Sequence, residues 1–412
     1  REDSAGCLKA RSRLGEDGSM LPFRWVCLGS LALVLGCSDR DVSWQPTGSD
    51  SGQLSLVTFN TAIGVGLAPY AEQRLDAIER ALPTLGADVI CLQELWQPDD
   101  LERLASDLAG EFPYSHRSVL ASGGAIESRC TDSEAQLLLT CLNANCADVE
   151  QAGLPLCAIA NCATAFTQTA QPCQQCVVAN QAAPDVSTLI DICSADDSSA
   201  QDYENQTGLL LLSKLPLTET RYLALDSSLA DRGVLGATVQ SGGGPISLYC
   251  THLAASIGEV VPYSGPYGSW QGERIAQIGQ FLPWVAETRS GDDRAVLLGD
   301  LNCGPETPLA SGASADAYRL FTDAGFADPY AAEDGRCTFC SNNPLNGLAN
   351  GSDEGALIDH VLLDGFEDAP AVTGTRVLDG ELIVSADGGD VTTAHSDHYG
   401  VRVDVSWLEA AP

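Results

Sequence analysis

The sequence is poor in basic residues, and lysine occurs only at Lys9 and Lys214. Its 21 lysines and arginines are outnumbered by 56 aspartates and glutamates, so the net charge is −35 at pH 7. A surface of that charge repels anions, and no basic stripe is visible, which argues against tight non-specific binding to duplex nucleic acid. A nuclease is not excluded, because a bound divalent cation changes the local field. The acidic surface can equally serve solubility alone.

The sequence also lacks internal repeats and long hydrophobic runs. The apolar segment Trp25–Leu35 is too short for a transmembrane helix. Arg24 precedes this segment, which predicts a signal peptide that starts at Met20. Residues 1–19 are polar and are interpreted as an upstream extension of the reading frame. We therefore expect an exported protein.

Residues 34–37, Val-Leu-Gly-Cys, resemble a bacterial lipobox, whose cysteine is acylated after cleavage. An N-terminal lipid anchor on Cys37 would attach the protein to a membrane of the cell envelope, whereas a plain secretory signal would release it. Residues 1–37 are thus predicted to be extension and signal peptide, and the polar residues 38–52 to be a linker. No obligate protein partner is evident from the sequence.

Cysteine, in contrast, is abundant, with 16 residues. Removal of the signal peptide would eliminate Cys7 and Cys27, and acylation would use Cys37, which leaves 13. Eight of these lie between Cys130 and Cys193. An even number in a short window of an exported chain predicts up to four disulfides there.

The remaining cysteines lie outside that window. Residues 337 and 340 are spaced for a local disulfide, and two among Cys91, Cys250 and Cys303 can pair. At least one of the 13 is expected to stay free or to bond elsewhere. Zinc is the competing hypothesis, because the spacing Cys-x₂-Cys occurs at residues 173–176 and 337–340.

Hydrophobic periodicity predicts many short strands with a few helices between them. The strands are expected at 53–60, 88–92, 208–212, 217–224, 233–239, 246–252, 294–300, 356–363, 371–377 and 400–405. The helices are expected at 71–82, 100–108, 272–286 and 315–324, with Pro83 ending the first and Pro283 interrupting the third. The connections between strands are too short for parallel crossovers. We therefore expect an α/β protein of two packed, mostly antiparallel sheets flanked by helices.

Residues 124–205 break this pattern. They are rich in alanine, glutamine, asparagine and cysteine, nearly free of basic residues, and helical in spacing at 135–146 and 158–167. They separate two predicted strands that fit one sheet. We interpret them as a Cys-rich helical insertion, held by disulfides, within a domain of residues 53–406.

Polar residues stand at the ends of several predicted strands, where a sheet edge does not need them. One such residue alone is usually a turn former, so the evidence is the ordered set. The set comprises Asn60, Gln93-Glu94, Thr251-His252-Leu253, Gly299-Asp300-Leu301-Asn302, Ile358-Asp359-His360 and Ser396-Asp397-His398. Four of the five histidines (252, 360, 395 and 398) lie in or beside these motifs.

This combination of residues suits phosphodiester hydrolysis. Oxygen ligands from Glu94, assisted by Asn60 and Asp397, would hold Mg²⁺, with Mn²⁺ or Ca²⁺ as alternatives. The cation would polarise a phosphoryl oxygen. A histidine held by a carboxylate would deprotonate the attacking water, and a second histidine would donate to the phosphate or leaving oxygen.

The order of the motifs resembles the endonuclease/exonuclease/phosphatase superfamily over residues 53–406, apart from the insertion. The resemblance implies a four-layered α/β sandwich with the site at one end of the sheets, and a Mg²⁺-dependent phosphoric diester hydrolase. It places Asn60 and Glu94 at the metal, and Asp397 at the metal or beside the base. It places His252 at the phosphate or leaving group, and Asp300 and Asn302 at the nucleophile and phosphate. His398 is then the general base, and Asp359 is the carboxylate that orients His398.

Within the superfamily, neutral sphingomyelinases are the most similar, through the motifs at residues 94–96, 231–237 and 251–255. The negative charge also suits a zwitterionic headgroup better than a polyanion. The Cys-rich insertion is foreign to that family, and no aromatic hairpin for membrane insertion is obvious. Tyr263, Tyr267 and Trp270 are the nearest candidates, with packing onto the sandwich as the alternative.

Three classes of function therefore stay open. The first is a sphingomyelinase-like lipid phosphodiesterase, and the second is an extracellular endonuclease of the deoxyribonuclease type. The third is a non-catalytic binding lipoprotein on the same fold, which the complete set of acids, bases and ligands argues against. Another hydrolase of the superfamily, such as an inositol-phosphate phosphatase, is a further alternative.

Overall fold

A computed structural model describes residues 51–64, 68–117, 129–149, 154–180, 183, 185–194, 207–241, 244–257, 262–289, 294–346, 355–366, 369, 371–386 and 388–408. The predicted extension, signal peptide and lipobox lie outside these residues, as does the linker up to residue 50. Ser51 and Gly52, predicted to belong to the linker, instead begin the first strand. None of the helices within the described ranges is long and apolar enough to cross a membrane.

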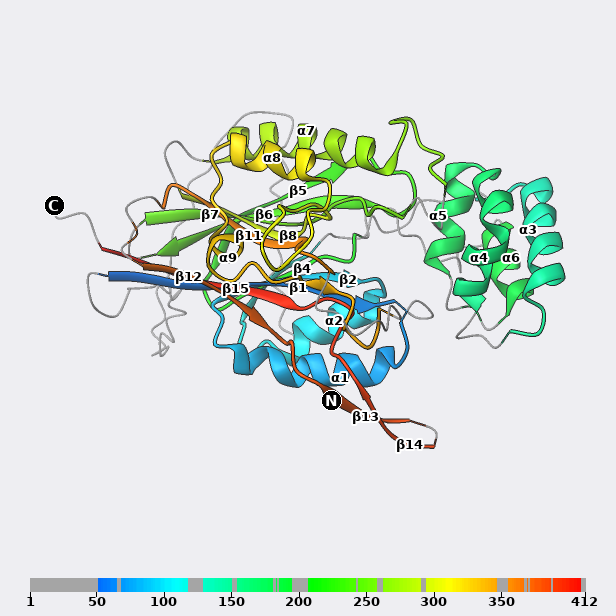
Figure 1. Cartoon of the computed structure of the whole chain (residues 1–412), viewed down its shortest axis with the longest axis horizontal. Coiled ribbons are helices and arrows are strands. Elements are labelled where there is room, and N and C mark those ends of the chain that lie inside the picture. Colours follow the sequence, from blue (N-terminus) through cyan, green and yellow to red (C-terminus); the bar gives the residue numbers. More distant parts are fainter. Residues whose placement is uncertain are drawn as a thin grey trace, which may run out of the picture. The chain divides into compact units, whose positions relative to one another are not determined.

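Two sheets form the centre of the protein (Figure 1). The six-stranded sheet has the order β12 (Ala371–Val377), β15 (Gly400–Leu408), β1 (Ser51–Ile63), β2 (Val89–Leu95), β4 (Leu210–Ser213), β3 (Tyr114–Arg117). The five-stranded sheet has the order β11 (Asp359–Asp364), β8 (Arg294–Asp300), β7 (Gly244–His252), β6 (Arg232–Ser241), β5 (Leu217–Leu225). Neighbouring strands are antiparallel except for the pairs β1–β2 and β7–β8, as the expected mostly antiparallel architecture requires.

Helices cover the outer face of each sheet, which makes four layers (Figure 1). Helices α1 (Ala71–Ala81) and α2 (Pro98–Asp107) share a core with the six-stranded sheet. Helices α7 (Trp270–Thr288) and α8 (Ala315–Asp323) share another with the five-stranded sheet. A third core lies between the sheets and includes Leu56, Leu248 and Val403. The predicted four-layered α/β sandwich is confirmed.

Alternation along β1 shows how the sequence positions the site. Leu54 and Leu56 belong to the core between the sheets, whereas Val57 and Phe59 belong to the core under the helices. The period of two in a strand places Asn60 on the same face as Leu54 and Leu56. Its side chain therefore points toward the other sheet at the end of the strand.

Two predicted elements need correction. The strand predicted at 356–363 is broken: β10 (Gly355–Ala356) pairs with β9 (Phe339–Cys340), and β11 begins only at Asp359. Helix α7 runs through Pro283 without interruption. Pro283 and Gly279, four residues earlier, are both exposed, so water can satisfy the carbonyl that proline leaves unpaired.

The elements missed entirely are β3, α5, α6, α9 (Pro329–Glu333) and the hairpin of β13 (Leu382–Ala386) and β14 (Gly389–Thr393). Pro83 lies where predicted, in a 3₁₀ turn (Leu82–Leu85) that follows α1.

The insertion is a bundle of four helices, α3 (Asp132–Asn145), α4 (Leu154–Thr167), α5 (Gln171–Ala179) and α6 (Val186–Ser194). All eight of its cysteines pair, as Cys130–Cys173, Cys141–Cys162, Cys146–Cys157 and Cys176–Cys193. The bundle has a hydrophobic core of its own, drawn only from insertion residues. The predicted disulfide scaffold is confirmed, and the zinc alternative at residues 173–176 is wrong because both cysteines form disulfides.

The other disulfides also follow the predicted pairs. Cys337 and Cys340 form the local disulfide, which excludes zinc there. Cys91 on β2 pairs with Cys250 on β7 and so links the two sheets covalently. Cys303 is free and buried.

Deleting the insertion should leave a folded sandwich. Strands β3 and β4 pair directly, with Arg117 opposite Leu210, so a short loop can replace residues 124–205. We expect such a variant to keep a cooperative thermal transition, to bind Mg²⁺ and to hydrolyse a small soluble phosphodiester. Calorimetry with and without Mg²⁺ measures this. Aggregation of the deletion variant would instead show that the bundle completes the core of the sandwich.

Candidate active site

The predicted motifs meet at one end of the two sheets. In the five-stranded sheet, Asp300 on β8 lies directly opposite His252 on β7 and Asp359 on β11. In the six-stranded sheet, Asn60 lies opposite Gln93, the residue before Glu94. The site is therefore built from the facing ends of both sheets.

Asn60 connects the two sheets through its side-chain amide. Its Nδ2 donates to Glu94 Oε1 over 3.1 Å and to Asp300 Oδ2 over 3.0 Å. Its Oδ1 accepts the backbone N–H of Ala62 over 3.1 Å, so both ends of the amide have partners. Asn60 thus holds two carboxylates that belong to different sheets.

Backbone conformation at two motif residues departs from ordinary strand geometry. Glu94 and Asn302 have φ angles of 60° and 51°, a region that residues with a Cβ rarely adopt. The turn at Glu94 moves its side chain off the face that strand alternation assigns to it and toward Asn60. The glycine of the Gly-Asp-Leu-Asn motif has a steric reason, because a Cβ at Gly299 would lie 2.1 Å from the carbonyl oxygen of Thr251.

His398 and Asp359 form a buried pair. His398 Nδ1 lies 2.8 Å from Asp359 Oδ2, which leaves Nε2 directed toward Asp300 Oδ2 at 3.8 Å. Burial opposes charging of the imidazole, but the carboxylates of Asp359 and Asp300 outweigh it and raise the pKa of His398 well above its usual value. Asp359 therefore fixes the orientation of the ring and stabilises its protonated form.

His252 has the opposite electrostatic character. Its Nε2 lies 3.4 Å from Asp300 Oδ2 and 3.9 Å from Glu94 Oε1. Burial, together with the charges of Arg232 and His398, lowers the pKa of His252 well below its usual value. Both imidazoles thus approach the same carboxylate oxygen of Asp300. The environment favours His398 as a cation and His252 as the neutral ring.

The carboxylates of Glu94 and Asp300 are destabilised as charges, which is the environment that a bound cation relieves. Burial and the nearby Asp397 raise the pKa of Glu94. Burial and Asp359 raise the pKa of Asp300 to about 7. Within the described part of the chain, Asp300, Asp359 and His398 have potential ligand atoms within 4.8 Å of one another. These three residues offer candidate ligands for a divalent cation, and they differ from the predicted metal set of Glu94, Asn60 and Asp397.

Asn302 and Asp397, the other two predicted residues, also lie at this end of the sheets. The backbone N–H of Asn302 donates to Asp300 Oδ1 over 2.8 Å, and its side chain donates to Leu253 O over 3.0 Å. Asp397 is close enough to Glu94 and His398 to raise the pKa of both. All eight predicted site residues are thus brought together, and their individual roles remain predictions.

Three buried nitrogen atoms at the site have no hydrogen-bond partner among the described residues: Arg232 Nη1, Trp96 Nε1 and His252 Nδ1, of which the last is a donor in one of the two tautomers of neutral histidine. The Arg232 guanidinium lies over the Trp96 ring at 5.6 Å, and the Trp96 and His252 ring centres are 6.4 Å apart. Buried donors without partners are costly unless a ligand satisfies them. This donor cluster, Arg232, Trp96 and His252, lies beside the carboxylates and suits an anionic group.

Sequence reasoning did not single out Arg232 and Trp96, although both lie in quoted motifs. The available signal was the scarcity of basic residues, which makes an arginine at the start of a predicted strand next to a motif conspicuous. Two histidines near the motifs are structural. His360 is held between Asp328 Oδ2 and Cys303 O, and the carbonyl of His395 accepts from Arg74.

The aromatic loop residues pack on the protein. Tyr263 and Trp270 make an edge-to-face contact at 5.0 Å, and Trp270 is buried. Tyr263 donates to Glu273 over 2.9 Å, and Tyr267 donates to Asp226. These residues pack on the protein, as the packing alternative expects.

The chain belongs to the endonuclease/exonuclease/phosphatase family, whose profile matches residues 57–398. Members of this family are hydrolases that act on phosphodiesters. The comparison with curated proteins finds no match.

Several solved structures share the fold. Sphingomyelinase C from Streptomyces griseocarneus is 18% identical with a TM-score of 0.52, over 85% of this chain and 99% of that chain. Beta toxin from Staphylococcus aureus, with bound magnesium ions, is 13% identical with a TM-score of 0.53, over 87% of this chain and 100% of that chain. At such identities the likeness establishes the fold.

Proposed function

We propose that the protein is an exported, Mg²⁺-dependent phosphodiesterase that hydrolyses a phospholipid headgroup in the manner of a sphingomyelinase. The observation that carries this proposal is the position of the donor cluster beside a buried histidine–aspartate pair. A cluster of unpaired donors binds an anion, and a carboxylate-held imidazole activates water. A phosphodiester needs both in one place.

The side chains divide the reaction between them. His398, held at Nδ1 by Asp359, takes a proton from the attacking water at Nε2 once the imidazole is in its neutral form. His252 is favoured as neutral imidazole and donates a hydrogen bond to the leaving oxygen, while Arg232 binds a phosphoryl oxygen. Glu94, with Asn60 and Asp397, would hold Mg²⁺, and the bound cation would supply charge that polarises a phosphoryl oxygen.

A lipid headgroup is favoured over nucleic acid as the substrate. The chain carries a net charge of −35, which opposes long polyanions more strongly than a single zwitterionic headgroup. Two solved structures with the same fold are named as a sphingomyelinase and a toxin. The alternative of an extracellular endonuclease rests on the shared family. The alternative of a non-catalytic lipoprotein is disfavoured because the pair of His398 and Asp359 is intact.

Export is supported by the six disulfides within the described residues, since disulfides persist in oxidising compartments. The lipid anchor on Cys37 belongs to the same proposal and is tested by mass spectrometry of the protein isolated from its host. A diacylglyceryl mass on the N-terminal cysteine supports the anchor, and an unmodified cleaved N-terminus rejects it.

A substrate panel tests the function. Purified protein is assayed on sphingomyelin vesicles, duplex DNA and bis(p-nitrophenyl) phosphate, each with Mg²⁺, Mn²⁺, Ca²⁺ or EDTA. We expect headgroup release from the vesicles with Mg²⁺, slow turnover of the soluble diester and no activity with EDTA. Efficient DNA cleavage without lipid turnover would favour the nuclease, and inactivity on all three would favour the binding lipoprotein.

Arg232→Met should weaken substrate binding. The substitution removes the charged donor and keeps much of the side-chain volume, so we expect KM to rise about tenfold, equivalent to ~1.4 kcal/mol. The matched control is Arg319→Met, which removes the same charge from an exposed position on α8. Equal kinetics for the two variants would remove Arg232 from the substrate site.

A further inference from the structure

The hydrogen bond between His398 and Asp359 crosses from one sheet to the other. Asp359 is the first residue of β11 in the five-stranded sheet, and His398 lies two residues before β15 of the six-stranded sheet. Facing sheets are normally about 10 Å apart and are held by side-chain packing alone. A 2.8 Å contact between them therefore depends on how the sheet ends are held together.

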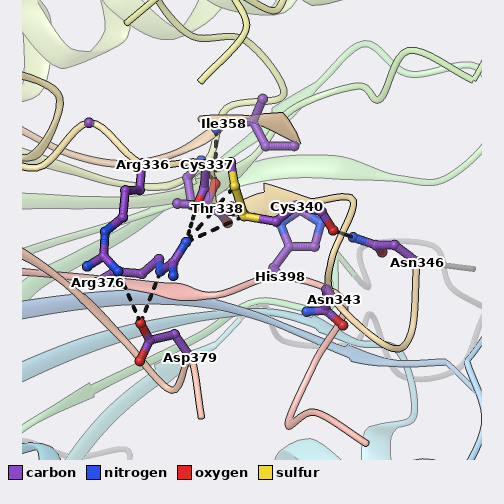
Figure 2. Close-up of a disulfide and its surroundings, with 12 residues drawn as sticks. Arg336, Cys337, Thr338, Cys340, Asn343, Asn346, Ile358, Arg376, Asp379 and His398 are labelled. Carbon is purple, nitrogen blue, oxygen red and sulfur yellow. Dashed lines mark hydrogen bonds and ion pairs between the residues drawn. A yellow bond between two sulfur atoms is a disulfide. The ribbon is translucent and has the colours of Figure 1, made fainter. Parts of the chain in front are cut away.

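The disulfide loop Cys337–Cys340 lies at this junction (Figure 2). Within it, Thr338 is fully buried and bonds to both sides. Its Oγ1 accepts the backbone N–H groups of Ile358 and Asp359, each over 3.1 Å. Its carbonyl accepts the backbone N–H of Tyr399 over 2.8 Å. One residue thus ties the start of β11 to the residue that follows His398.

The neighbouring residue contacts the base itself. Phe339 forms a β-bridge with His398, and their ring centres are 5.0 Å apart. The position of the His398 ring is therefore set on one side by Asp359 and on another by the loop.

Further bonds hold the loop and the turn that carries His398. Arg376 Nη1 on β12 donates to Cys337 O over 3.0 Å, and its guanidinium lies 4.6 Å from the centre of the Tyr399 ring. Asn343 donates to Ser396 O over 2.8 Å, and Asn346 donates to both Cys340 O and Asp397 O. Figure 2 shows these side chains converging on the disulfide and on His398.

We propose that the loop Cys337–Cys340 is a positioning element for the general base, and that Thr338 is the residue through which it acts. The proposal rests on the proposed function, since it assigns the base role to His398. The disulfide restricts the loop, and Thr338 transfers that restraint to the two chain segments that carry Asp359 and His398. Both cysteines are buried, so the disulfide acts here as a fixed clamp.

Thr338→Val tests the proposal because valine keeps the shape and removes the hydroxyl acceptor. Displacing a catalytic group slightly reduces turnover without weakening ground-state binding, so we expect kcat to fall about 10- to 100-fold with KM nearly unchanged. Thr338→Ser retains the acceptor and should restore kcat to within about threefold. The matched control is Thr238→Val, a buried threonine on β6 remote from the motif end of that strand, which should leave kcat unchanged.

The readouts separate failure of this proposal from failure of the proposed function. All variants are assayed on bis(p-nitrophenyl) phosphate with Mg²⁺, and the histidine N–H resonances are followed by NMR without substrate. An inactive wild-type protein would reject the function. An active wild type with wild-type kcat in Thr338→Val, or an equal loss in Thr338→Ser, would overturn the positioning role.

The NMR measurement also covers a variant that folds poorly. We expect the Nδ1–H signal of His398, assigned with His398→Ala, to shift or broaden in Thr338→Val and in the double variant Cys337→Ser/Cys340→Ser. If both variants are folded and keep the wild-type signal, the loop does not position the base. If Thr338→Val does not fold, the double variant alone gives the result. The measurements are then the same Nδ1–H signal and the same comparison, a fall in kcat with KM nearly unchanged.

Discussion

Glu94→Gln abolishes nearly all hydrolysis and leaves the fold intact: this is the largest effect that we expect. Glutamine keeps the size of the side chain and an acceptor for Asn60, but it removes the carboxylate charge from the metal site. Metal stabilisation of phosphoryl charge amounts to several kcal/mol, so a loss of about 10³-fold in kcat/KM is expected. Steady-state kinetics at saturating Mg²⁺ measures this loss.

The stability of the same variant gives an independent measurement. Glu94 is partly buried near Asp397, and this burial with the repulsion raises its pKa, so the charged form is unfavourable without a cation. Removing the charge should leave the Tm of the metal-free protein unchanged or higher, while the increase in Tm on adding Mg²⁺ should shrink. Glu72→Gln, which removes an exposed glutamate on α1, is the control and should leave both quantities unchanged. Wild-type turnover in Glu94→Gln would refute the metal assignment.

His398→Ala should have the second largest effect. Loss of a general base costs about 10²- to 10⁴-fold in turnover, because water must then be deprotonated by solvent. The fold should survive, since His398 lies in the turn before β15, outside the three sandwich cores. Turnover measured across pH 5–9, with circular dichroism as a check of folding, gives the comparison. A loss smaller than tenfold would assign the base to another residue.

Asp359→Asn should act on the same step with a distinct pH signature. His398 must be neutral to accept a proton, so activity rises with pH through the pKa of His398. Burial lowers that pKa and Asp359 raises it, with a net increase. Removing the carboxylate therefore lowers the pKa, and the acidic limb of the pH–rate profile should move to lower pH while the plateau falls. An acidic limb that stays in place would show that Asp359 does not govern His398.

Most of the sandwich could be predicted because its strands carry clear local signals. The segments 294–300 and 371–377 were predicted with the bounds that β8 and β12 have in the structure. Each has an apolar or alternating pattern with turn residues at its ends, and burial then follows from the pattern. The hairpin β13–β14 was missed because its strands are largely exposed, so apolar and polar residues do not alternate clearly along them, as the 66% exposure of Ile383 illustrates.

The site was predicted as a set, but its geometry was not. Strand-end motifs identify which residues gather, whereas the turn at Glu94 and the orientation of the Asn60 amide depend on contacts between the sheets. Disulfide connectivity could not be deduced either, since eight cysteines in one window allow 105 pairings. Arg232 was missed as a site residue because the evidence for its role is a buried donor without a partner, which can be recognised only in the folded protein.

The disulfide between Cys91 and Cys250 makes the covalent joining of the two halves of the site depend on oxidation. The catalytic groups are divided between two sheets, and this disulfide joins those sheets across a separation of 159 residues in the chain. In a reducing cytoplasm the link is absent, and the two halves of the site are held together only by packing and by hydrogen bonds such as those of Asn60 and His398. If the protein is exported, as proposed, this disulfide forms only after export, and the covalent link between the two halves of the site is then absent from the chain in the cytoplasm.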